Sequence, residues 1–365
     1  MTRNLNDFLD SIRTHLTDNV KSRVIVIGND SADLDSIISS LLFAYASSLN
    51  DTTQLYIPLV KVPKADLQLR PELKFVCEKA AVDMQKLICI DEVSLTPGPI
   101  VLIDHNHLTS PFNEEAWNNK VVGVLDHHVD EHLYGNALLR VVQMVGSSVT
   151  LVLDHFSETS DWLNDQVIQL ALAPLLVDTV NFNRELNRTT DLDVKMFEWL
   201  TSALHAPMDF TLYFKDVEHA KSQVDDMSNR DILRRDYKEF TVNGYRIGTS
   251  SVPWYFQAWI DRDGVDVINE AVSDYGKERE LDMEVIFTSY DHSGDYRREL
   301  AVFALNKELM PIKQRLEQTD SIQLNPLFTA SASDAHLHYY QQGNIKMSRK
   351  QVWPLLKDIL EESKL

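Results

Sequence analysis

The strongest chemical signal in the sequence is a group of possible metal ligands that follow three apolar runs. These residues lie in GNDSADLDS at 28–36, LIDHN at 102–106 and LDHH at 125–128. Carboxylate and amide oxygens are typical ligands of hard divalent cations, and imidazole nitrogen binds several transition metals. Helix capping is the simpler explanation for one acid, because Asp33 or Asp35 would stabilise the start of a following helix. Capping does not explain ligand-type residues after all three runs.

A fourth carboxylate, Asp178, lies in PLLVDTVNF after an apolar, helix-like segment. In isolation it would be a buried cap or turn residue. The adjacent histidines His127 and His128 follow Asp126, and this grouping favours a metal or phosphate contact over two ordinary imidazoles. The sequence therefore predicts a metal centre, and we include Asp178 among its candidate ligands.

The elements that must position these residues are predicted from the alternation of apolar runs with helix-like segments. The runs expected to form strands are residues 24–28, 54–59, 86–90, 100–104 and 121–126. This alternation predicts an α/β domain with a parallel sheet and helices on both faces. Because the carboxyl ends of parallel strands share one edge of a sheet, the three motifs are expected to meet there. Residues 147–204 have helical apolar spacing and should cover the sheet.

A second domain is expected because 365 residues exceed what one hydrophobic core usually serves. We place the first domain at residues 1–205 and a second, smaller α/β domain with a mixed sheet at 211–365, with the linker inside 203–211. The predicted elements of the second domain are a charged helix at 215–240, a hairpin that turns at Asn243 and Gly244, strands at 283–290 and 299–305 joined by a turn at 291–294, and a helix at 351–360.

The composition limits the kinds of partner. With 35 Lys and Arg against 55 Asp and Glu, the formal net charge is -20, which argues against a nucleic-acid surface. A polyanionic substrate remains compatible, because a local cluster of cations can attract anions to an acidic protein. The apolar runs are too short to span a membrane and the N-terminus lacks a signal-like core, so we expect a cytoplasmic protein without membrane partners. Cys77 and Cys89 should be reduced core thiols.

Taken in order, GNDSADLDS, LIDHN, LDHHVDE and VDTVNF resemble the successive motifs of the DHH phosphoesterases. The resemblance implies two divalent cations, one held by Asp33 and Asp104 with Asn29 nearby, the other by Asp35, Asp104, His127 and Asp178. Asp104 would bridge the two. It also implies that His128 faces the phosphoryl group, that Asp126 orients an imidazole from behind, and that His105 helps to bind substrate. The expected catalytic residues are thus Asp104, His128 and Asp126.

The residue that opens the first motif separates branches of this family. Manganese-type inorganic pyrophosphatases have His at this position, whereas Asn29 resembles the fungal exopolyphosphatase branch. An amide is a harder and weaker ligand than imidazole, so this metal position should accept Mg²⁺ more readily. We therefore expect two divalent cations, with Mg²⁺ favoured and with Mn²⁺ or Co²⁺ able to substitute.

Two cationic motifs in the second half resemble the phosphate-binding motifs of the DHHA2 domain. LRRDYKEF contains Arg235 and Lys238, near an expected helix end, and MSRKQVWP contains Arg349 and Lys350. A single Lys or Arg is usually a solvated surface charge, and Arg235 is open to that explanation. Arg349 and Lys350 are adjacent at a predicted helix start, where cations oppose the helix dipole unless an anion binds. Three further cations, Lys61, Lys64 and Arg70, lie in a loop after a predicted strand. They either line a channel that leads to the metals or are ordinary surface charges.

The resemblance as a whole implies an exopolyphosphatase, which releases orthophosphate from the end of inorganic polyphosphate by metal-assisted hydrolysis. The alternatives are a manganese-type pyrophosphatase, a prune-like hydrolase of cyclic nucleotides or short polyphosphates, and an enzyme that cleaves short RNA. Nano-RNase relatives carry a different, glycine-rich C-terminal domain, which disfavours RNA. A scaffold protein is the non-enzymatic alternative, and the intact acidic ligands disfavour it. We expect a monomer with no nucleic-acid partner.

Overall fold

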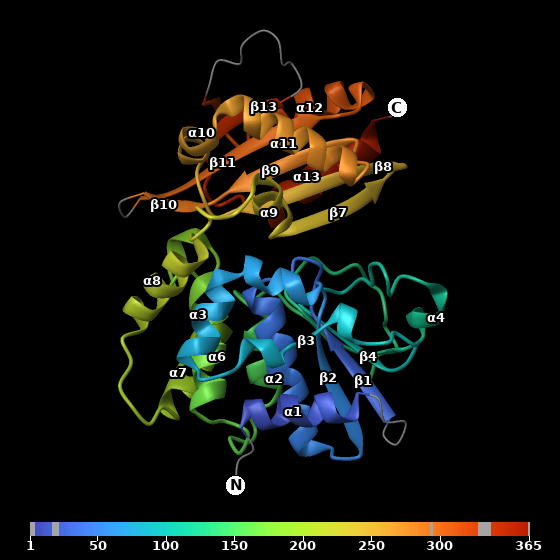
Figure 1. The fold of residues 1–365 in the computed structure, drawn as a ribbon, viewed down its shortest axis with the longest axis vertical. Helices are drawn as coiled ribbons and strands as arrows, with labels where there is room; N and C mark the ends of the chain where they lie inside the picture. Colours follow the sequence, from blue (N-terminus) through green and yellow to red (C-terminus); the bar gives the residue numbers. More distant parts are fainter. Residues whose placement is uncertain (1–3, 17–21, 293–294, 328–336, 364–365) are drawn as a thin grey trace. The chain divides into compact units, whose positions relative to one another are not determined.

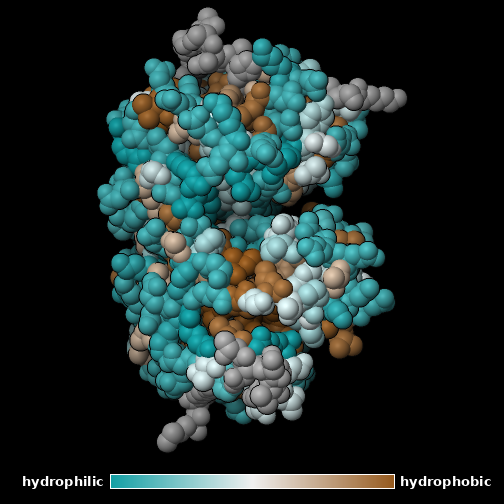
Figure 2. Space-filling model, turned by 45° about the vertical axis from the view of Figure 1, so that its right-hand side comes forward, coloured by the Kyte–Doolittle hydropathy of each residue, from teal (hydrophilic) through white to brown (hydrophobic). Residues whose placement is uncertain are grey.

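The computed structural model describes residues 4–16, 22–292, 295–327 and 337–363. The chain forms two compact units, Met1–Lys221 and Ser222–Leu365 (Figure 1). No helix within the described ranges is both long and apolar enough to cross a membrane. Most of the face drawn in Figure 2 is hydrophilic, and hydrophobic residues gather in one area of the first unit.

The first unit combines a six-stranded sheet with helices, so the predicted α/β architecture is confirmed. Its strands are β1 (Ser22–Ile27), β2 (Gln54–Val60), β3 (Ile88–Cys89), β4 (Ile100–Ile103), β5 (Val121–Asp126) and β6 (Leu139–Val142). Its helices are α1 (Leu5–His15), α2 (Leu34–Asn50), α3 (Pro71–Lys79), α4 (Glu115–Asn118), α5 (Ser148–His155), α6 (Asp165–Asp178), α7 (Asp191–Ser202) and α8 (Phe210–Lys221).

The strand order β3-β2-β1-β4-β5-β6 shows where a ligand can bind. All neighbouring pairs in this sheet are parallel, as predicted. From β1 the chain crosses through α2 to β2, whereas from β4 it crosses through α4 to β5, in the opposite direction along the sheet. The connections therefore diverge between β1 and β4. Open α/β sheets bind their ligands at such a switch point, beyond the carboxyl ends of the strands.

The layer formed by β1, β4 and α2 is buried because its sequence is apolar without alternation. All four residues of β4, residues 24–27 of β1 and residues 34–47 of α2 are buried. Strands covered on both faces have such continuous apolar runs. Gly28 follows β1, and a Cβ atom there would lie 2.8 Å from the Ser36 Cβ and 2.9 Å from the Ser36 carbonyl oxygen. Glycine is therefore needed for the tight turn between β1 and α2.

Two features of the first unit differ from the sequence prediction. Strand β6 was not predicted, because it is four residues long and only half-buried, which gives it a weak apolar signal. Helix α8 was assigned to the second domain by the linker at 203–211, but it packs on the first unit. Its Tyr213 is buried, lies with its ring centroid 6.4 Å from that of Phe75 and donates a hydrogen bond to the Gln169 carbonyl at 3.0 Å. These contacts place the division between the units after α8.

The second unit is built on a mixed sheet, as predicted. Its strands are β7 (Tyr237–Val242), β8 (Tyr245–Val252), β9 (Met283–Thr288), β10 (Tyr290–His292), β11 (Asp295–Ala304), β12 (Leu324–Pro326) and β13 (Leu337–Gln342). Its helices are α9 (Asn229–Arg234), α10 (Phe256–Asp263), α11 (Val265–Glu278), α12 (Met310–Glu317) and α13 (Arg349–Glu362). The strand order is β12-β13-β11-β9-β8-β7, and β10 pairs with β11. Strands β8 and β9 are parallel, and the other pairs are antiparallel.

The start of the second unit shows one correct and one wrong prediction. The hairpin is confirmed, since β7 and β8 are antiparallel and the turn residues Asn243 and Gly244 have φ of 51° and 85°. The single charged helix at 215–240 is wrong, because this stretch is divided among α8, α9 and β7. Ser228 starts the new helix α9 by accepting a hydrogen bond from the Asp231 N–H.

The remaining elements predicted for the second unit are mostly present. Strands at 283–290 and 299–305 are confirmed by β9 and β11, and the helix at 351–360 lies within α13. The turn predicted at 291–294 includes residues 293 and 294, which lie outside the described residues.

One carboxyl group in the second unit is buried between strands. Glu284 on β9 is 0% exposed and accepts a hydrogen bond from Ser250 Oγ at 2.6 Å, while its Oε2 has no hydrogen-bond partner within the described residues. Gly248 provides the space, because a Cβ atom there would overlap Oε2. Burial raises the pKa of Glu284 to about 8, since the charged form would be poorly solvated.

Replacing Glu284 by Gln should make the free energy of unfolding less sensitive to pH between about 4.5 and about 8. The folded state holds the Glu284 proton more tightly than the unfolded chain, whose pKa is near 4.5. This contribution to stability is complete below that value and is lost as pH rises through about 8. Between pH 4.5 and about 8, the free energy of unfolding should fall more steeply with pH in the wild type than in Glu284→Gln. The difference between the two slopes should be up to about 1.4 kcal/mol per pH unit.

Urea unfolding at several pH values measures this difference. The matched control is the exposed Glu270→Gln, which should follow the wild-type pH dependence. Parallel pH profiles for Glu284→Gln and the wild type would mean that Glu284 is ionised in the folded protein at neutral pH.

Candidate metal centre

The residues that follow β1 and β4 meet at the switch point of the first sheet. Asn29 Nδ2 donates a hydrogen bond to Asp104 Oδ2 at 2.7 Å, and the two residues are only 4% and 2% exposed. They are 75 residues apart in the sequence. The first two motifs, GNDSADLDS and LIDHN, therefore meet at the sheet edge, as predicted.

Asp104 is the central carboxylate of this group. Besides Asn29, its Oδ2 accepts a hydrogen bond from Ser36 Oγ at 2.7 Å, and its Oδ1 accepts one from Ser148 Oγ at 3.2 Å. Its backbone has φ of 62°, a left-handed conformation that costs energy for a residue other than glycine. Asp104 is thus held at a sharp turn directly after β4, with both carboxylate oxygens in contact with the surrounding elements.

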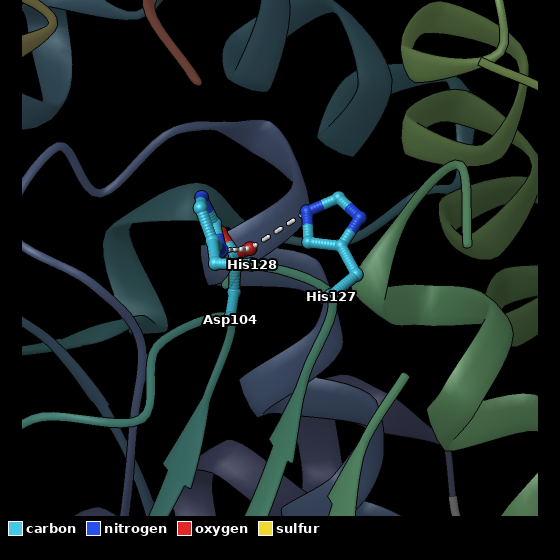
Figure 3. Close-up of side chains that lie close together, drawn as sticks. All are labelled: Asp104, His127 and His128. Carbon is cyan, nitrogen blue, oxygen red and sulfur yellow. Dashed lines mark ion pairs between the residues drawn. The ribbon is translucent and has the colours of Figure 1, made fainter. Parts of the chain in front are cut away.

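His127, directly after β5, is oriented as a metal-binding imidazole. Its Nδ1 lies 3.0 Å from the Val145 carbonyl oxygen, which can only accept, so Nδ1 carries the proton. Its Nε2 lies 3.1 Å from Asp104 Oδ1 and 3.8 Å from Asp35 Oδ2. Figure 3 shows the ring directed toward the Asp104 carboxylate. A histidine that donates from one nitrogen to a carbonyl and turns the other toward carboxylates is typical of metal centres.

His128 is paired with Asp126 as well as with the central carboxylate. Its Nδ1 lies 2.7 Å from Asp126 Oδ1 and 3.5 Å from Asp104 Oδ1, and its backbone N–H also donates to Asp126 Oδ1 at 3.1 Å. Burial alone would raise the pKa of Asp126, but the charge and hydrogen bond of His128 hold that pKa well below its usual range. Asp126 is therefore ionised and fixes the orientation of the His128 imidazole.

Asp35 brings a second buried carboxylate to the group from the first turn of α2. Its oxygens accept hydrogen bonds from the backbone N–H groups of Ser148 at 2.7 Å and Val149 at 3.0 Å. Burial, followed by the negative charges of Asp104 and Asp178, raises the pKa of Asp35 to about 8. The carboxylates thus repel one another in a poorly solvated space, and a divalent cation between them would offset that repulsion.

The other predicted site residues of the first unit are placed as follows. Asp33 is half-buried and caps α2 by accepting the Ser36 N–H at 3.0 Å, which is the capping role considered for it. Asp178 is the last residue of α6, and its charge acts on Asp35. Burial lowers the pKa of His105, whose Nδ1 lies 2.9 Å from the Ile103 carbonyl oxygen. Binding of metal by Asp33 and Asp178, and of substrate by His105, stays a prediction.

The arrangement can hold a divalent cation. One ligand atom from each of Asp104, His127 and His128 lies within 4.8 Å of the others, and Asp35 Oδ2 lies 3.8 Å from His127 Nε2. Carboxylate oxygens combined with imidazole nitrogen suit Mg²⁺, Mn²⁺ or Co²⁺. These donor atoms are therefore of the kinds that bind the divalent cations predicted from the sequence.

Comparison with known proteins assigns both halves of the chain. Residues 23–177 match the family described as DHH family, N-terminal domain, and residues 215–359 match the DHHA2 domain. The chain thus carries a DHH-family N-terminal domain followed by a DHHA2 domain.

Individual relatives of this DHH protein align along nearly all of its length. The "Putative exopolyphosphatase" of Schizosaccharomyces pombe is 28% identical over 355 residues, which cover 92% of this chain and 91% of that protein. Exopolyphosphatase PRUNE1 of Rattus norvegicus is 27% identical over 366 residues, which cover 98% and 79%. A solved structure described as "Crystal structure of Methanococcus jannaschii putative family II inorganic pyrophosphatase" has a TM-score of 0.67 at 21% identity, and the match covers 92% of this chain and 99% of that one. That likeness confirms the fold.

The four predicted cations of the DHHA2 domain lie in four different settings. Arg349 begins α13, and its guanidinium contacts Asp236 through Oδ1 at 2.7 Å and the backbone oxygen at 3.0 Å. The anion expected at this helix start is thus supplied by the chain itself. Lys350 is exposed, and Lys238 lies on β7 rather than near a helix end. Arg235 is only 4% exposed, so a solvated surface charge is the wrong explanation for it.

Several residues that shape the centre were not predicted. The hydroxyls of Ser36 and Ser148 donate to Asp104, and a Gly-Ser-Ser sequence before an apolar helix was the available signal for Ser148. Arg70, considered as a channel cation, is 3% exposed and donates to the carbonyls of Ser31 and Ala32, each at 2.5 Å. It thereby fixes the turn between Asn29 and Asp33.

Proposed function

We propose that this DHH protein is an exopolyphosphatase that hydrolyses the terminal phosphoanhydride bond of inorganic polyphosphate and releases orthophosphate. The observation that carries the proposal is the buried group of Asp35, Asp104 and His127 at the switch point, in a chain whose relatives named exopolyphosphatase align with 92% and 98% of it. We assign metal binding to the DHH domain and binding of substrate phosphates to the DHHA2 domain. We further propose a cytoplasmic monomer that uses neither nucleic acid nor membrane.

Two divalent cations would be held by the side chains of this centre, and Mg²⁺ is favoured because an amide at position 29 would offer a cation an oxygen instead of an imidazole nitrogen. The proposed ligands are Asn29, Asp33, Asp35, Asp104, His127 and Asp178. When bound, such cations activate a water for attack on phosphorus and neutralise phosphate charge. The Val145 carbonyl keeps the proton on Nδ1 of His127, so that Nε2 stays available as an electron-pair donor.

His128 is proposed to act on the phosphoryl group. The Asp126 carboxylate, 2.7 Å from His128 Nδ1, orients the imidazole, and His128 would contribute a polar contact to the oxygens that gain charge in the transition state. In the DHHA2 domain, the residues proposed to bind further phosphates are Arg235, Lys238, Arg349 and Lys350. His105 is proposed as an additional substrate contact in the DHH domain. Arg349 would share its guanidinium between Asp236 and phosphate, which its planar set of donors permits.

A panel of substrates tests the function. Purified protein with Mg²⁺ is incubated with pyrophosphate, tripolyphosphate, long-chain polyphosphate or cyclic AMP, and release of orthophosphate or AMP is measured. We expect orthophosphate from tripolyphosphate and long chains. Activity confined to pyrophosphate would instead identify a pyrophosphatase, the second candidate, which the fold similarity also accommodates. Activity confined to cyclic AMP would exclude both.

Replacing Asn29 by His should shift metal preference from Mg²⁺ toward Mn²⁺ and Co²⁺. Imidazole binds transition metals more tightly than an amide oxygen does, and Mg²⁺ prefers oxygen. We expect the ratio of activity with Mn²⁺ to activity with Mg²⁺ to rise about tenfold or more, which corresponds to about 1.4 kcal/mol. Steady-state rates at saturating concentrations of each metal measure this ratio. The control, Asn113→His in an exposed loop, should leave it unchanged, and an unchanged ratio in Asn29→His would argue against Asn29 as a ligand.

A further inference from the structure

A fully buried carboxylate outside the proposed ligand set lies behind the centre. Asp193, in the first turn of α7, is 0% exposed. Its two oxygens accept the Gly146 backbone N–H at 3.0 and 2.9 Å, and one of them accepts the Thr150 hydroxyl at 2.6 Å. The other accepts the backbone N–H and hydroxyl of Thr190 at 2.7 and 2.8 Å. Burying a carboxylate is costly, and five such donor contacts offset that cost.

The simplest role for Asp193 is to cap its own helix. Thr190 and Asp193 form a capping box at the start of α7, and many helices begin with such a pair. That role uses the Oδ2 contacts to Thr190 but not the contacts to Gly146 and Thr150, which lie more than 40 residues away in the sequence. Asp193 therefore also ties the start of α7 to residues 145–150.

The 145–150 segment has little freedom to move on the side that faces α6 and α7. A Cβ atom at Gly146 would lie 2.5 Å from Thr179 Cγ2 and 2.6 Å from the Arg188 carbonyl oxygen. Only glycine allows this close approach. The Asp193 carboxylate holds Gly146 in this position by accepting its backbone N–H.

The opposite side of the 145–150 segment orients the proposed metal ligands. The Val145 carbonyl accepts from His127 Nδ1 at 3.0 Å. The N–H groups of Ser148 and Val149 donate to Asp35 at 2.7 and 3.0 Å, and Ser148 Oγ donates to Asp104 at 3.2 Å. One short stretch of chain thus fixes the tautomer of His127 and the rotamer of Asp35.

We propose that Asp193 is a positioning residue of the metal centre, which holds the 145–150 segment so that its backbone presents Asp35 and His127 to the cation. This inference rests on the proposed metal centre. Groups that orient metal ligands from behind typically change metal affinity by about 10–100-fold when they are removed. Asp193 acts one step further back, through the backbone of the segment rather than through a ligand.

The test is Mn²⁺ binding to the full-length protein, measured by electron paramagnetic resonance of free Mn²⁺ and by calorimetry. In Asp193→Asn, one oxygen becomes an N–H donor that faces the N–H groups of Gly146 or Thr190. We expect the Mn²⁺ dissociation constant to rise by about 10-fold or more while circular dichroism shows a folded protein. Turnover should recover in part when Mn²⁺ is raised, because the ligands themselves are intact.

The matched control is Thr190→Ala, which removes the cap side chain of α7 and leaves the Asp193 contacts with Gly146 and Thr150. It should lower the melting temperature but change the Mn²⁺ dissociation constant less than twofold. Equal Mn²⁺ affinity in Asp193→Asn and Thr190→Ala would overturn the inference and leave only the capping role. If the wild type itself fails to bind Mn²⁺, the proposed metal centre is at fault instead.

A second variant decides the matter if Asp193→Asn does not fold. Thr150→Val keeps the shape of a buried side chain and removes the hydroxyl that donates to Asp193 at 2.6 Å. Only one of the links between Asp193 and the 145–150 segment is lost, so we expect a smaller rise of the Mn²⁺ dissociation constant, of about 3-fold. An unchanged dissociation constant in this folded variant would overturn the inference.

Discussion

Asp104→Asn is expected to lower turnover by about 10³-fold, because loss of about 4 kcal/mol of metal and transition-state interaction corresponds to that factor. Asp104 Oδ2 accepts from Asn29 and Ser36, both at 2.7 Å, and Oδ1 lies 3.1 Å from His127 Nε2. An amide in this place carries no charge and turns a donor toward at least one of these partners. Asn adopts the left-handed backbone more readily than most residues, so the turn at φ of 62° should be preserved.

The experiment compares kcat on long-chain polyphosphate at saturating Mg²⁺, together with Mn²⁺ affinity, in the wild type and Asp104→Asn. Asp161→Asn is the matched control, because Asp161 is exposed in the same unit, and it should keep normal kcat. A folded Asp104→Asn protein with near-normal kcat and metal affinity would exclude Asp104 as the bridging ligand and with it the proposed mechanism.

The centre is able to bury carboxylates because helix starts and hydroxyls surround them. Asp35 lies in the first turn of α2 and also accepts N–H groups of Ser148 and Val149 at the start of α5. Two helix N-termini thus direct positive potential at one carboxylate. Burial and the neighbouring acids nevertheless raise the pKa of Asp35 to about 8, so without a cation this carboxyl group keeps its proton at neutral pH. A divalent cation would take the place of that proton, and the donor set suits one.

The convergence of Asn29 and Asp104 could be predicted from the sequence because it depends on a rule of sheet topology. Asn29 and Asp104 are 75 residues apart, but each directly follows a buried apolar run. Parallel strands bring such residues to one edge regardless of their distance in sequence. The strands themselves were clear because β1 and β4 are buried on both faces and lack alternation.

The contacts of the loops could not be predicted in the same way. The N–H of Ser148 reaches Asp35 across 113 residues, and Arg349 reaches Asp236 across the same separation. The helix dipole argument predicts that an anion lies near Arg349 but does not identify it as Asp236. The prediction of one helix at 215–240 was wrong for a related reason. Strand β7 is stabilised by its pairing with β8, and local charge patterns do not reveal that pairing.

Gly28→Ala is expected to combine a loss of stability with a loss of turnover. The added Cβ would lie 2.9 Å from the Ser36 carbonyl oxygen, a backbone atom of α2 that can move only with the helix. Overpacking of this kind costs about 1–3 kcal/mol. Gly28 precedes Asn29, and Ser36 donates to Asp104, so the same displacement separates groups that must converge. A shift of about 1 Å at a reacting centre can lower turnover by about 10²-fold.

The measurements are the free energy of unfolding and kcat at a temperature at which the variant is fully folded. Gly135→Ala is the matched control, since no atom lies within 4 Å of a Cβ built at Gly135, and it should alter neither quantity. Loss of stability with unchanged kcat would mean that the turn between β1 and α2 adjusts without moving Asn29 and Ser36. In that case the precise placement of these residues would depend on Asp104 and Arg70 rather than on the close approach at Gly28, because Asp104 binds both side chains and Arg70 holds the carbonyls of the turn.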